Sequence, residues 1–474
     1  MNFLSITQLL SLILASVFCS GCFAPLSDRT PQGKISQPPQ WESNVSISDA
    51  NISATGWALY LGGEELALLI EKAVSHNPSL LAMSERLIAQ GEKTTILGAQ
   101  LLPSAQAEVT GSRSKRNLIG FNLPNGSTSF TSNSFTTGIN ISWELDLWGK
   151  LADARDSAKT SFDAGVQELK SAQISLAGQV SKVWCEIIEL SQQFTLAQNS
   201  AASFAQNQNF VEERFSKGLA NALELNLART GTAAAEAKSL ALQGLLETTK
   251  RRLNILLGQY PSVHLDQNIS SSLTAITPLT IYHSSPSALL TGRPDLLAAE
   301  KRAKASGLDL AVARKNFFPS LILTGGPGSR SDEFENLLDN NFRTWGINGS
   351  LNLPIFNGGR LRAAHRQAKA MQAAAWADYR VCALNAFVEV ENILAAEIRL
   401  AKEEKLLQQA ADSAEEAARI SWERYQRGVE AIFNALENQR RAFDARSQAY
   451  AIQKSRIHNR VDLHLALGQF PLSK

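Results

Sequence analysis

The sequence predicts a mainly α-helical protein with a small β part, built from one structural unit that occurs twice. Three observations carry this prediction: an internal duplication, two very long stretches without proline, and short alternating segments between the helices. In each copy the expected order is a helix, two strands, a very long helix and a return helix. Self-similarity at a fixed offset is the signature of repeated units.

The duplication is visible in motifs that keep their register. Proline motifs near Pro78 and Pro294 share an offset of 294 − 78 = 216, and glycine motifs near Gly149 and Gly359 share an offset of 359 − 149 = 210. Between them an offset of 346 − 138 = 208 is expected. The matched segments are Asn77-Pro78-Ser79-Leu80 with Arg293-Pro294-Asp295-Leu296, Leu102-Pro103-Ser104 with Phe318-Pro319-Ser320, Gly138-Ile139-Asn140 with Gly346-Ile347-Asn348, and Leu257-Gly258-Gln259 with Leu467-Gly468-Gln469.

The first helix of each copy begins at Pro78 or Pro294 and ends before Pro103 or Pro319, because proline suits a helix start and interrupts a helix interior. Serine- and threonine-rich segments with alternating apolar residues follow, and this period of two is typical of strands. The expected strands are residues 105–110 and 138–145 in the first copy, and residues 321–324 and 345–351 in the second.

The long helices are expected over 151–217 and 361–427, which are rich in alanine, glutamine and glutamate. At 1.5 Å per residue each spans about 100 Å. Gly218 and Gly428 then end them as C-cap glycines. The return helices, 222–257 and 432–467, together with the first helices nearly match the long helix in length. A continuous helix and an interrupted helix are therefore expected side by side, as in the wall of a tunnel.

Composition argues against catalysis and against nucleic acid as a partner. The chain has 46 Lys+Arg and 44 Asp+Glu, a formal net charge of +2, so no strongly basic surface is indicated. The six histidines are scattered, so neither a metal site nor a cofactor is expected. Gly325-Gly326-Pro327-Gly328-Ser329-Arg330 lacks the lysine of a phosphate-binding loop and is interpreted as a strand end or loop.

The N-terminus reads as a secretory signal, residues 1–21, that ends beside Cys22. The junction resembles the lipobox of bacterial lipoproteins, which implies acylation of Cys22. A lipidated tether is expected over 22–60, then a first repeat over 61–275 and a second over 276–474. Cys185 and Cys382 form no disulfide or metal pattern and are expected to pack inside helices.

Four strands per chain cannot close a barrel, because closed membrane barrels need at least eight. Three chains would supply twelve strands, and would also repeat the helical wall into a tube. A trimer with a 12-stranded transmembrane β-barrel on an α-helical tunnel is therefore expected. An elongated coiled-coil lipoprotein with a small sheet remains the structural alternative.

The ordered motifs resemble the TolC-type outer-membrane efflux proteins, in the NodT/OprM-like lipoprotein branch. The resemblance covers nearly the whole chain after Cys22. The segments that carry it are Gly56-Trp57, Asn77-Pro78-Ser79-Leu80, Ser142-Trp143-Glu144-Leu145-Asp146-Leu147-Trp148-Gly149, Leu353-Pro354-Ile355-Phe356-Asn357-Gly358-Gly359-Arg360, and Tyr425 with Gly428.

The resemblance implies a homotrimeric outer-membrane channel whose helical tunnel lies in the periplasm. Its implied partners are a periplasmic adaptor (membrane fusion) protein, an inner-membrane pump of the resistance–nodulation–division class, and outer-membrane lipid. The channel is then a passive exit duct for small toxic compounds, with no enzymatic activity, and the pump determines the substrate. A duct for type I protein secretion has the same fold and is the functional alternative.

The turns after the long helices are the expected functional positions. Glu430, Asn434 and Glu437 are spaced for one helix face, which a trimer would repeat as a ring around its axis. The family carries acidic gate residues at the positions of Asn434 and Glu437 and an aromatic residue at Tyr425; Asn434 departs from that pattern. Glu224 occupies the position of Asn434 in the first copy.

Basic residues flank the same turns. Arg214 and Arg424 are expected to cap the last helical carbonyls or to contact the adaptor, together with Gly218 and Gly428. Arg229, Arg440 and Arg441 are expected to pair with the acidic residues across neighbouring helices.

Overall fold

The computed structural model describes residues 41, 56–117, 129–264 and 286–472. The expected mainly helical fold with a small β part is confirmed. The signal, Cys22 and most of the tether lie outside the described residues. The first repeat consists of α2 (Trp57–His76), α3 (Pro78–Ala99), β1 (Ser104–Asn117), β2 (Ser129–Leu145), α4 (Lys150–Ser216) and α5 (Ala222–Leu256).

The second repeat has the same order. It consists of α6 (Pro286–Gly292), α7 (Pro294–Lys315), β3 (Ser320–Ser331), two short 3-10 helices (Phe334–Leu338 and Asn340–Phe342), β4 (Arg343–Asn352), α8 (Arg360–Gln426) and α9 (Ile432–Ala466). Helices α4 and α8 both have 67 residues, and α5 and α9 both have 35. None of the helices in the described ranges combines the length and the hydropathy that a membrane span needs.

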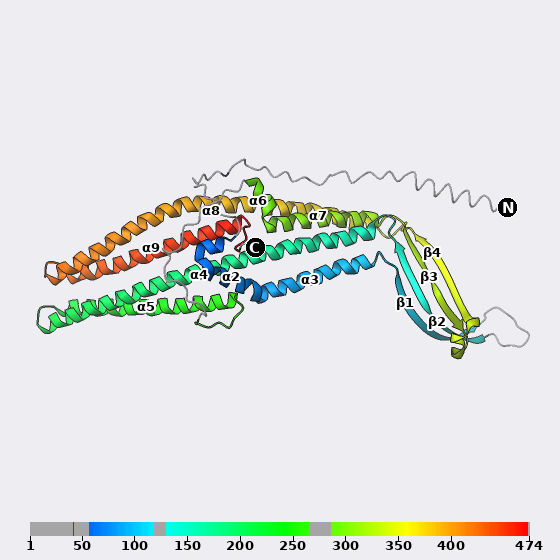
Figure 1. Cartoon of the computed structure of the whole chain (residues 1–474), viewed down its shortest axis with the longest axis horizontal. Coiled ribbons are helices and arrows are strands. Elements are labelled where there is room, and N and C mark those ends of the chain that lie inside the picture. The colour runs from blue at the N-terminus through cyan, green and yellow to red at the C-terminus, as the bar shows by residue number, and fades with distance from the viewer. Residues whose placement is uncertain (1–40, 42–55, 118–128, 265–285, 473–474) are drawn as a thin grey trace, which may run out of the picture. The chain divides into compact units, whose positions relative to one another are not determined.

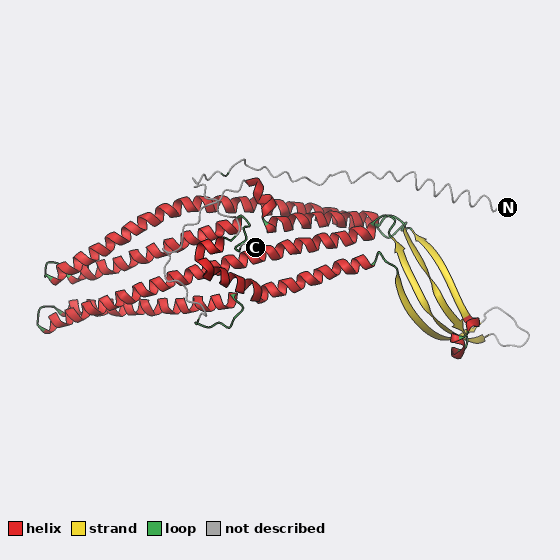
Figure 2. Ribbon diagram, viewed as in Figure 1, coloured by secondary structure: helices red, strands yellow, loops and turns green. Residues whose placement is uncertain are grey.

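Helix α4 is the centre of the helical layer. It packs against α3 and α5 of its own repeat and against α7 and α9 of the second repeat, whereas α8 packs against α7 and α9. Each long helix thus lies beside two shorter helices placed one after the other, as expected (Figure 1). The strands lie beyond one end of this layer, and the α4–α5 and α8–α9 turns lie at the other (Figure 2).

The four strands form one antiparallel sheet in the order β1-β2-β3-β4. Ser104 pairs with Ser142, and Ser320 pairs with Asn352. Because Ser104 and Ser320 are 216 residues apart, Ser142 and Asn352 are equivalent, at 352 − 142 = 210. The offset of 208 expected for this strand pair is therefore wrong, and the offset changes only between β1 and β2.

Helix α2 begins at Trp57, inside the segment assigned to the tether. It is kinked at Gly62 and Gly63, whose backbone angles are not helical, and Gly63 has a φ of 64° that only glycine adopts readily. A Cβ on Gly62 would lie 2.8 Å from the ring of Trp184. These two glycines therefore let α2 pack directly on α4, where Trp57 and Trp184 are both buried in the main hydrophobic core.

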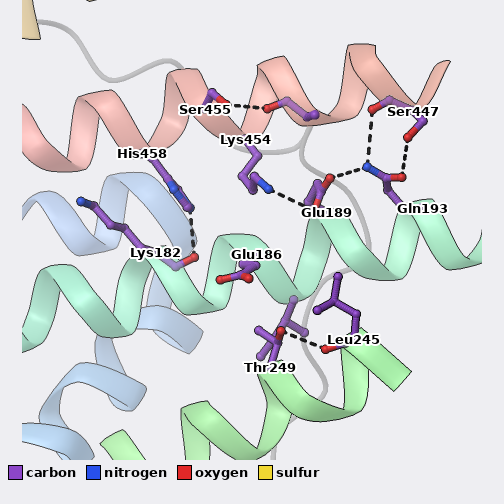
Figure 3. A network of polar contacts seen from close by, with 12 residues as sticks. Lys182, Glu186, Glu189, Gln193, Leu245, Thr249, Ser447, Lys454, Ser455 and His458 are labelled. Atoms are coloured by element: carbon purple, nitrogen blue, oxygen red, sulfur yellow. Dashed lines mark hydrogen bonds and ion pairs between the residues drawn. The ribbon is translucent and has the colours of Figure 1, made fainter. Parts of the chain in front are cut away.

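A polar network joins α4 to α9 across the two repeats (Figure 3). Glu189, which is 2% exposed, accepts a hydrogen bond of 2.5 Å from Gln193 and lies 3.5 Å from the ammonium of Lys454. Ser447 of α9 donates to Gln193 at 2.6 Å. A buried carboxylate needs such partners, because an unpaired one would carry a large desolvation cost. The network therefore fixes which residues of α4 and α9 face each other.

Candidate functional site at the tip turns

The two tip turns, residues 217–221 and 427–431, connect the long helices to the return helices. Gly218 and Gly428 lie in them with φ values of 68° and 75°. The amide of Leu219 donates to the Arg214 carbonyl at 2.8 Å, and the amide of Val429 donates to the Arg424 carbonyl at 3.0 Å. Both turns therefore end their long helix in the same way, with the left-handed glycine that the sequence predicts.

Tyr425 joins the two tip turns. Its side chain is 4% exposed, and its hydroxyl donates to Oε2 of Glu224 at 3.3 Å, which connects α8 with α5. Burial, and then the nearby Glu224 carboxylate, raise the pKa of Tyr425. The hydroxyl therefore keeps its proton and remains a donor at neutral pH. This bond couples the second repeat to the first at the tip.

Glu224 is held in place by Asn221, a residue that sequence reasoning missed. The side-chain oxygen of Asn221 accepts from the Glu224 amide at 2.9 Å, and its nitrogen donates to the Glu224 carboxylate at 3.3 Å. Asn followed three residues later by Glu is a helix-start signal that could have revealed the pair. The cap fixes the first turn of α5 and hence the position of the carboxylate.

Arg214 lies over the aromatic side chains of the tip. Its guanidinium carbon is 5.5 Å from the ring centre of Tyr425 and 5.9 Å from that of Phe210. Trp422 completes this aromatic cluster, with its ring centre 5.4 Å from that of Tyr425. Within the described residues, the buried Nε of Arg214 has no hydrogen-bond partner. Its Nη2 donates to the Leu219 carbonyl of the turn at 3.5 Å, so this carbonyl and the cation–π contacts both hold the arginine.

The expected acidic face of α9 is wrong at its first residue. Glu430 precedes α9, which begins at Ile432, and its carboxylate accepts from Arg424 of α8 at 3.0 Å. Asn434 and Glu437 lie on the first turns of α9, and Asn434 is exposed. Glu430 therefore stabilises the turn itself and does not share a helix face with the other two.

The expected charge pairing across helices is also wrong within the described chain. Glu437 pairs with Arg440 at 2.8 Å and Arg441 at 2.9 Å, both on its own helix. Hydrogen bonds from these arginines lower the pKa of Glu437 to about 2. Arg229 pairs with Glu212 at 3.2 Å and not with Glu224. Glu437 therefore has its partners within α9, where residues three and four positions apart are neighbours, and Arg229 pairs with a different carboxylate on the facing helix α4.

A groove of about 360 Å³ lies beside the tip between α4, α5 and α9. Phe204, Leu227 and Phe433 give it apolar walls, while Glu437 and Lys238 place charges along it. Glu437 therefore lies near the start of α9 and also lines this groove.

The remaining sequence candidates lie away from the tips. The glycine-rich segment 325–330 is inside β3 and pairs with β4, so it is a strand interior and not a strand end or loop. Cys185 is buried, and burial raises its thiol pKa. In the described ranges no group of three His, Cys, Asp or Glu residues is placed to hold a metal ion. Cys22 lies outside them.

Comparison with protein families gives a match along most of the chain. The sequence model of the outer membrane efflux protein family matches residues 69–259 and 285–469, which correspond to the two repeats.

Three relatives that match most of the chain are each named as outer-membrane proteins. The pyoverdine export outer membrane protein OpmQ of Pseudomonas putida is 31% identical over 465 residues, covering 97% of this chain and 96% of that protein. Outer membrane protein OprJ of Pseudomonas aeruginosa is 31% identical over 402 residues, covering 83% and 82%. The toluene efflux pump outer membrane protein TtgC of Pseudomonas putida is 28% identical, covering 97% and 95%.

Solved structures share the fold over nearly the same length. A membrane protein from Pseudomonas aeruginosa matches with a TM-score of 0.82 and 29% identity, covering 92% of this chain and 99% of that one. The open state of the MtrE outer membrane channel of Neisseria gonorrhoeae matches with a TM-score of 0.77 and 26% identity, covering 93% and 99%.

Proposed function

The chain belongs to the outer membrane efflux protein family and is an outer-membrane efflux channel, and on this basis we propose that three copies form a passive exit duct. The duct receives small toxic compounds from an inner-membrane resistance–nodulation–division pump through a periplasmic adaptor protein. Relatives are named for export of pyoverdine, toluene and antibiotics. The protein supplies a path and no reaction, so it needs no cofactor.

The arrangement of the sheet carries the proposal of a shared duct. β1 and β4 are the edges of a four-stranded sheet, and every residue of both strands is exposed in the single chain. Unpaired edges favour pairing with another chain. Three copies joined edge to edge would give a twelve-stranded barrel with the helical layers below it, and the tip turns would then form the far opening.

The tip turns are proposed to close and to dock the duct. Glu224, Tyr425 and Glu437, with Asn434 and Glu430 nearby, form the constriction, supported by the Tyr425–Glu224 bond between repeats. The exposed Gly218, Arg424 and Gly428, together with the half-buried Arg214 beside them, contact the adaptor. Acylation of Cys22 anchors the segment that precedes α2, and the two repeats, the first beginning with α2, build the channel.

Native mass spectrometry and planar-bilayer recording test this function together. The proposal expects a trimer that conducts in discrete steps, with conductance that rises when the tips are loosened. A monodisperse monomer without channel activity would exclude it and would favour an elongated coiled-coil lipoprotein.

A further inference from the structure

The four-stranded sheet has one apolar face and one polar face. Ala105 of β1 pairs with Ile141 of β2, which pairs with Gly325 of β3. Gly325 pairs in turn with Ile347 of β4. Because alternate residues of a strand point to the same face, the odd-numbered residues of all four strands share one face.

The odd-numbered face is the apolar one. Most of the large apolar side chains of the sheet lie on it, including Val109, Ile139, Trp143, Leu323, Trp345 and Ile347. The even-numbered residues are mainly serine, threonine, asparagine and glycine. In the shared barrel proposed above, the odd-numbered face contacts lipid, because membrane barrels carry their apolar residues outward.

Basic residues end this apolar face where the sheet lies farthest from the helices (Figure 1). Arg113 and Lys115 lie near the end of β1, and Arg343 begins β4 just before Trp345. All three basic residues, here called the basic rim, are exposed. Within the four described strands, the odd-numbered face carries no acidic residue. Because the helical layer lies in the periplasm, the basic rim lies at the outer leaflet of the membrane.

The basic rim is not neutralised by ion pairs in the described part of the chain. None of its three side chains forms a hydrogen bond or an ion pair with another described residue. The β1–β2 connection, residues 118–128, has no charged residue. The 3-10 helices of the β3–β4 connection pack against the inner strands β2 and β3, whereas the rim lies on the edge strands. The carboxylates of that connection are Asp332, Glu333, Glu335 and Asp339. The rim is therefore available to an anionic partner.

Edge-to-edge assembly gathers the basic rim at each junction between two chains. Phe135 pairs with Ser331 across β2 and β3. Their equivalents, at 345 − 135 = 210 and 331 − 115 = 216, are Trp345 of β4 and Lys115 of β1, so Trp345 lies opposite Lys115 of the next copy. Arg343 is then the diagonal neighbour of that lysine, at about 7–8 Å. The second basic residue of β1 follows two positions away, so three positive charges surround Trp345.

We propose that each junction binds a phosphorylated glycolipid of the outer leaflet, the diphosphorylated lipid A of lipopolysaccharide. Its acyl chains lie along the odd-numbered face, and its phosphates pair with Arg113, Lys115 and Arg343. A guanidinium binds phosphate through two parallel hydrogen bonds, and basic residues at a membrane surface attract anionic lipid. Trp345 suits the boundary between acyl chains and headgroup, where tryptophan is enriched. The inference rests on the proposed trimer and specifies a lipid that it recognises.

Two basic residues on the polar face provide a matched comparison. Arg116 follows Lys115 but is even-numbered, so it points to the opposite face. Arg330 of β3 is also even-numbered, and its side chain donates to the Ser134 hydroxyl at 3.2 Å. In the shared barrel both arginines face the interior, which the acyl chains do not reach. They therefore separate recognition of lipid from a general effect of positive charge.

Native mass spectrometry of the detergent-purified trimer tests the site without any substitution. Diphosphorylated lipid A is expected to bind at up to three sites per trimer, at least about tenfold more tightly than lipid A freed of its phosphates and than phosphatidylglycerol. Equal binding of lipid A with and without its phosphates would overturn the role of the basic rim. Equal binding of phosphatidylglycerol would overturn the assignment to lipid A.

Charge removal then locates the site. Lys115→Gln with Arg343→Gln is expected to weaken lipid A binding about 25-fold, since each basic residue at an anionic membrane surface contributes about fivefold. Arg116→Gln with Arg330→Gln removes the same charge from the polar face and is expected to bind lipid A like the wild type. Equal loss in both double variants, or no loss in either, would overturn the site. A conducting trimer without phosphate-dependent binding overturns the site and leaves the duct function standing, whereas a monomer without channel activity excludes both.

Discussion

At the residue scale, the two repeats contribute different residues to the contact that holds the tip together. The first repeat supplies a carboxylate, Glu224, positioned by its helix cap, and the second supplies the buried hydroxyl of Tyr425. Arg214 covers the same ring. Glu437, by contrast, is paired within its own helix. Of these contacts, the bond between Tyr425 and Glu224 is the one that joins the two hairpins beside the tip turns.

Glu224→Ala is expected to raise the resting conductance of the channel while leaving trimer yield unchanged. The change leaves the buried Tyr425 hydroxyl without its acceptor, at a cost of about 1–3 kcal/mol. Tyr425→Phe removes only the donor and leaves the half-exposed Glu224 carboxylate to bind water, so it should loosen the tip less, by about 1 kcal/mol. Single-channel recording in planar bilayers measures both.

Two further variants serve as controls for the conductance of Glu224→Ala. Glu236→Ala removes an exposed carboxylate elsewhere on α5 and should conduct like the wild type. Glu437→Ala should change resting conductance less than Glu224→Ala, because its arginine partners lie on the same helix. Equal conductance of Glu224→Ala and Glu236→Ala would place the constriction elsewhere.

Cys22→Ala is expected to abolish incorporation of radiolabelled palmitate. The cysteine follows Gly21 at the end of the predicted signal, and acylation requires its thiol. Phe23, rather than an aspartate, follows Cys22, so the wild-type lipoprotein is expected in the outer-membrane fraction. Equal labelling of wild type and variant, or none in either, would contradict acylation at this residue.

At the element scale, glycine and proline residues that begin or end helices predicted most of the fold. Gly218 and Gly428 predicted the ends of α4 and α8 to within one residue, because a left-handed residue ends a helix sharply. The start of α2 was missed because Gly62 and Gly63 interrupt its helical pattern. β1 was underestimated because the exposed segment after Thr110 is polar and lacks alternation. Local sequence therefore predicts a helix or strand well only where the segment has a clear capping residue or a clear apolar period.

The candidate site was less predictable than the elements. The sequence indicated Glu224 and Tyr425 separately, but their contact joins residues that are 201 positions apart. It also suggested Arg229 as a partner, whereas that arginine reaches Glu212 on the facing helix. Spacing along one helix gives the face of a residue, but the partner depends on how two hairpins are aligned. That alignment is a tertiary property.

The docking of α2 on the C-terminal end of the chain is expected to weaken in acid. Trp57 stacks on His464 with ring centres 5.4 Å apart, and its indole donates to the Gln469 carbonyl at 3.2 Å. Burial lowers the pKa of His464, although the Gln469 side chain opposes the shift. The undocked state therefore binds more protons below about pH 6.5, and stability falls from there until the folded pKa is passed.

Hydrogen exchange of the α2 amides between about pH 7 and pH 5 measures this effect, with intrinsic rates subtracted. The wild type should lose protection at the acidic end, with a slope of at most about 1.4 kcal/mol per pH unit. His464→Gln should flatten the dependence, whereas His76→Gln, at an exposed position, should keep it. Parallel pH profiles for His464→Gln and wild type would contradict the assignment.

At the scale of the whole molecule, the duplication implies that equivalent surfaces of the two repeats make equivalent contacts. A single chain makes only some of these contacts. The internal contact between the repeats uses α4 with α7 and α9, and β2 with β3. The corresponding contact between chains would use α8 with α3 and α5, and β4 with β1. In the helical layer and in the sheet alike, a surface that is covered in one repeat is left uncovered at the equivalent position of the other. This pattern indicates a closed ring of identical subunits.

The same rule predicts the register between subunits in the sheet. Ser142 pairs with Thr324 across β2 and β3. Moving each residue to its equivalent, by 352 − 142 = 210 and 324 − 108 = 216, places Asn352 of β4 opposite Glu108 of β1 in the next copy.

Directly opposed residues have Cβ atoms about 5 Å apart. Glu108→Cys with Asn352→Cys should therefore form dimers and trimers with a short thiol cross-linker. Glu108→Cys with Ile347→Cys should not, because five residues along a strand is about 17 Å. Cross-linking of the control pair alone would show a different register, and a trimer in which neither pair reacts would show that these edges do not meet.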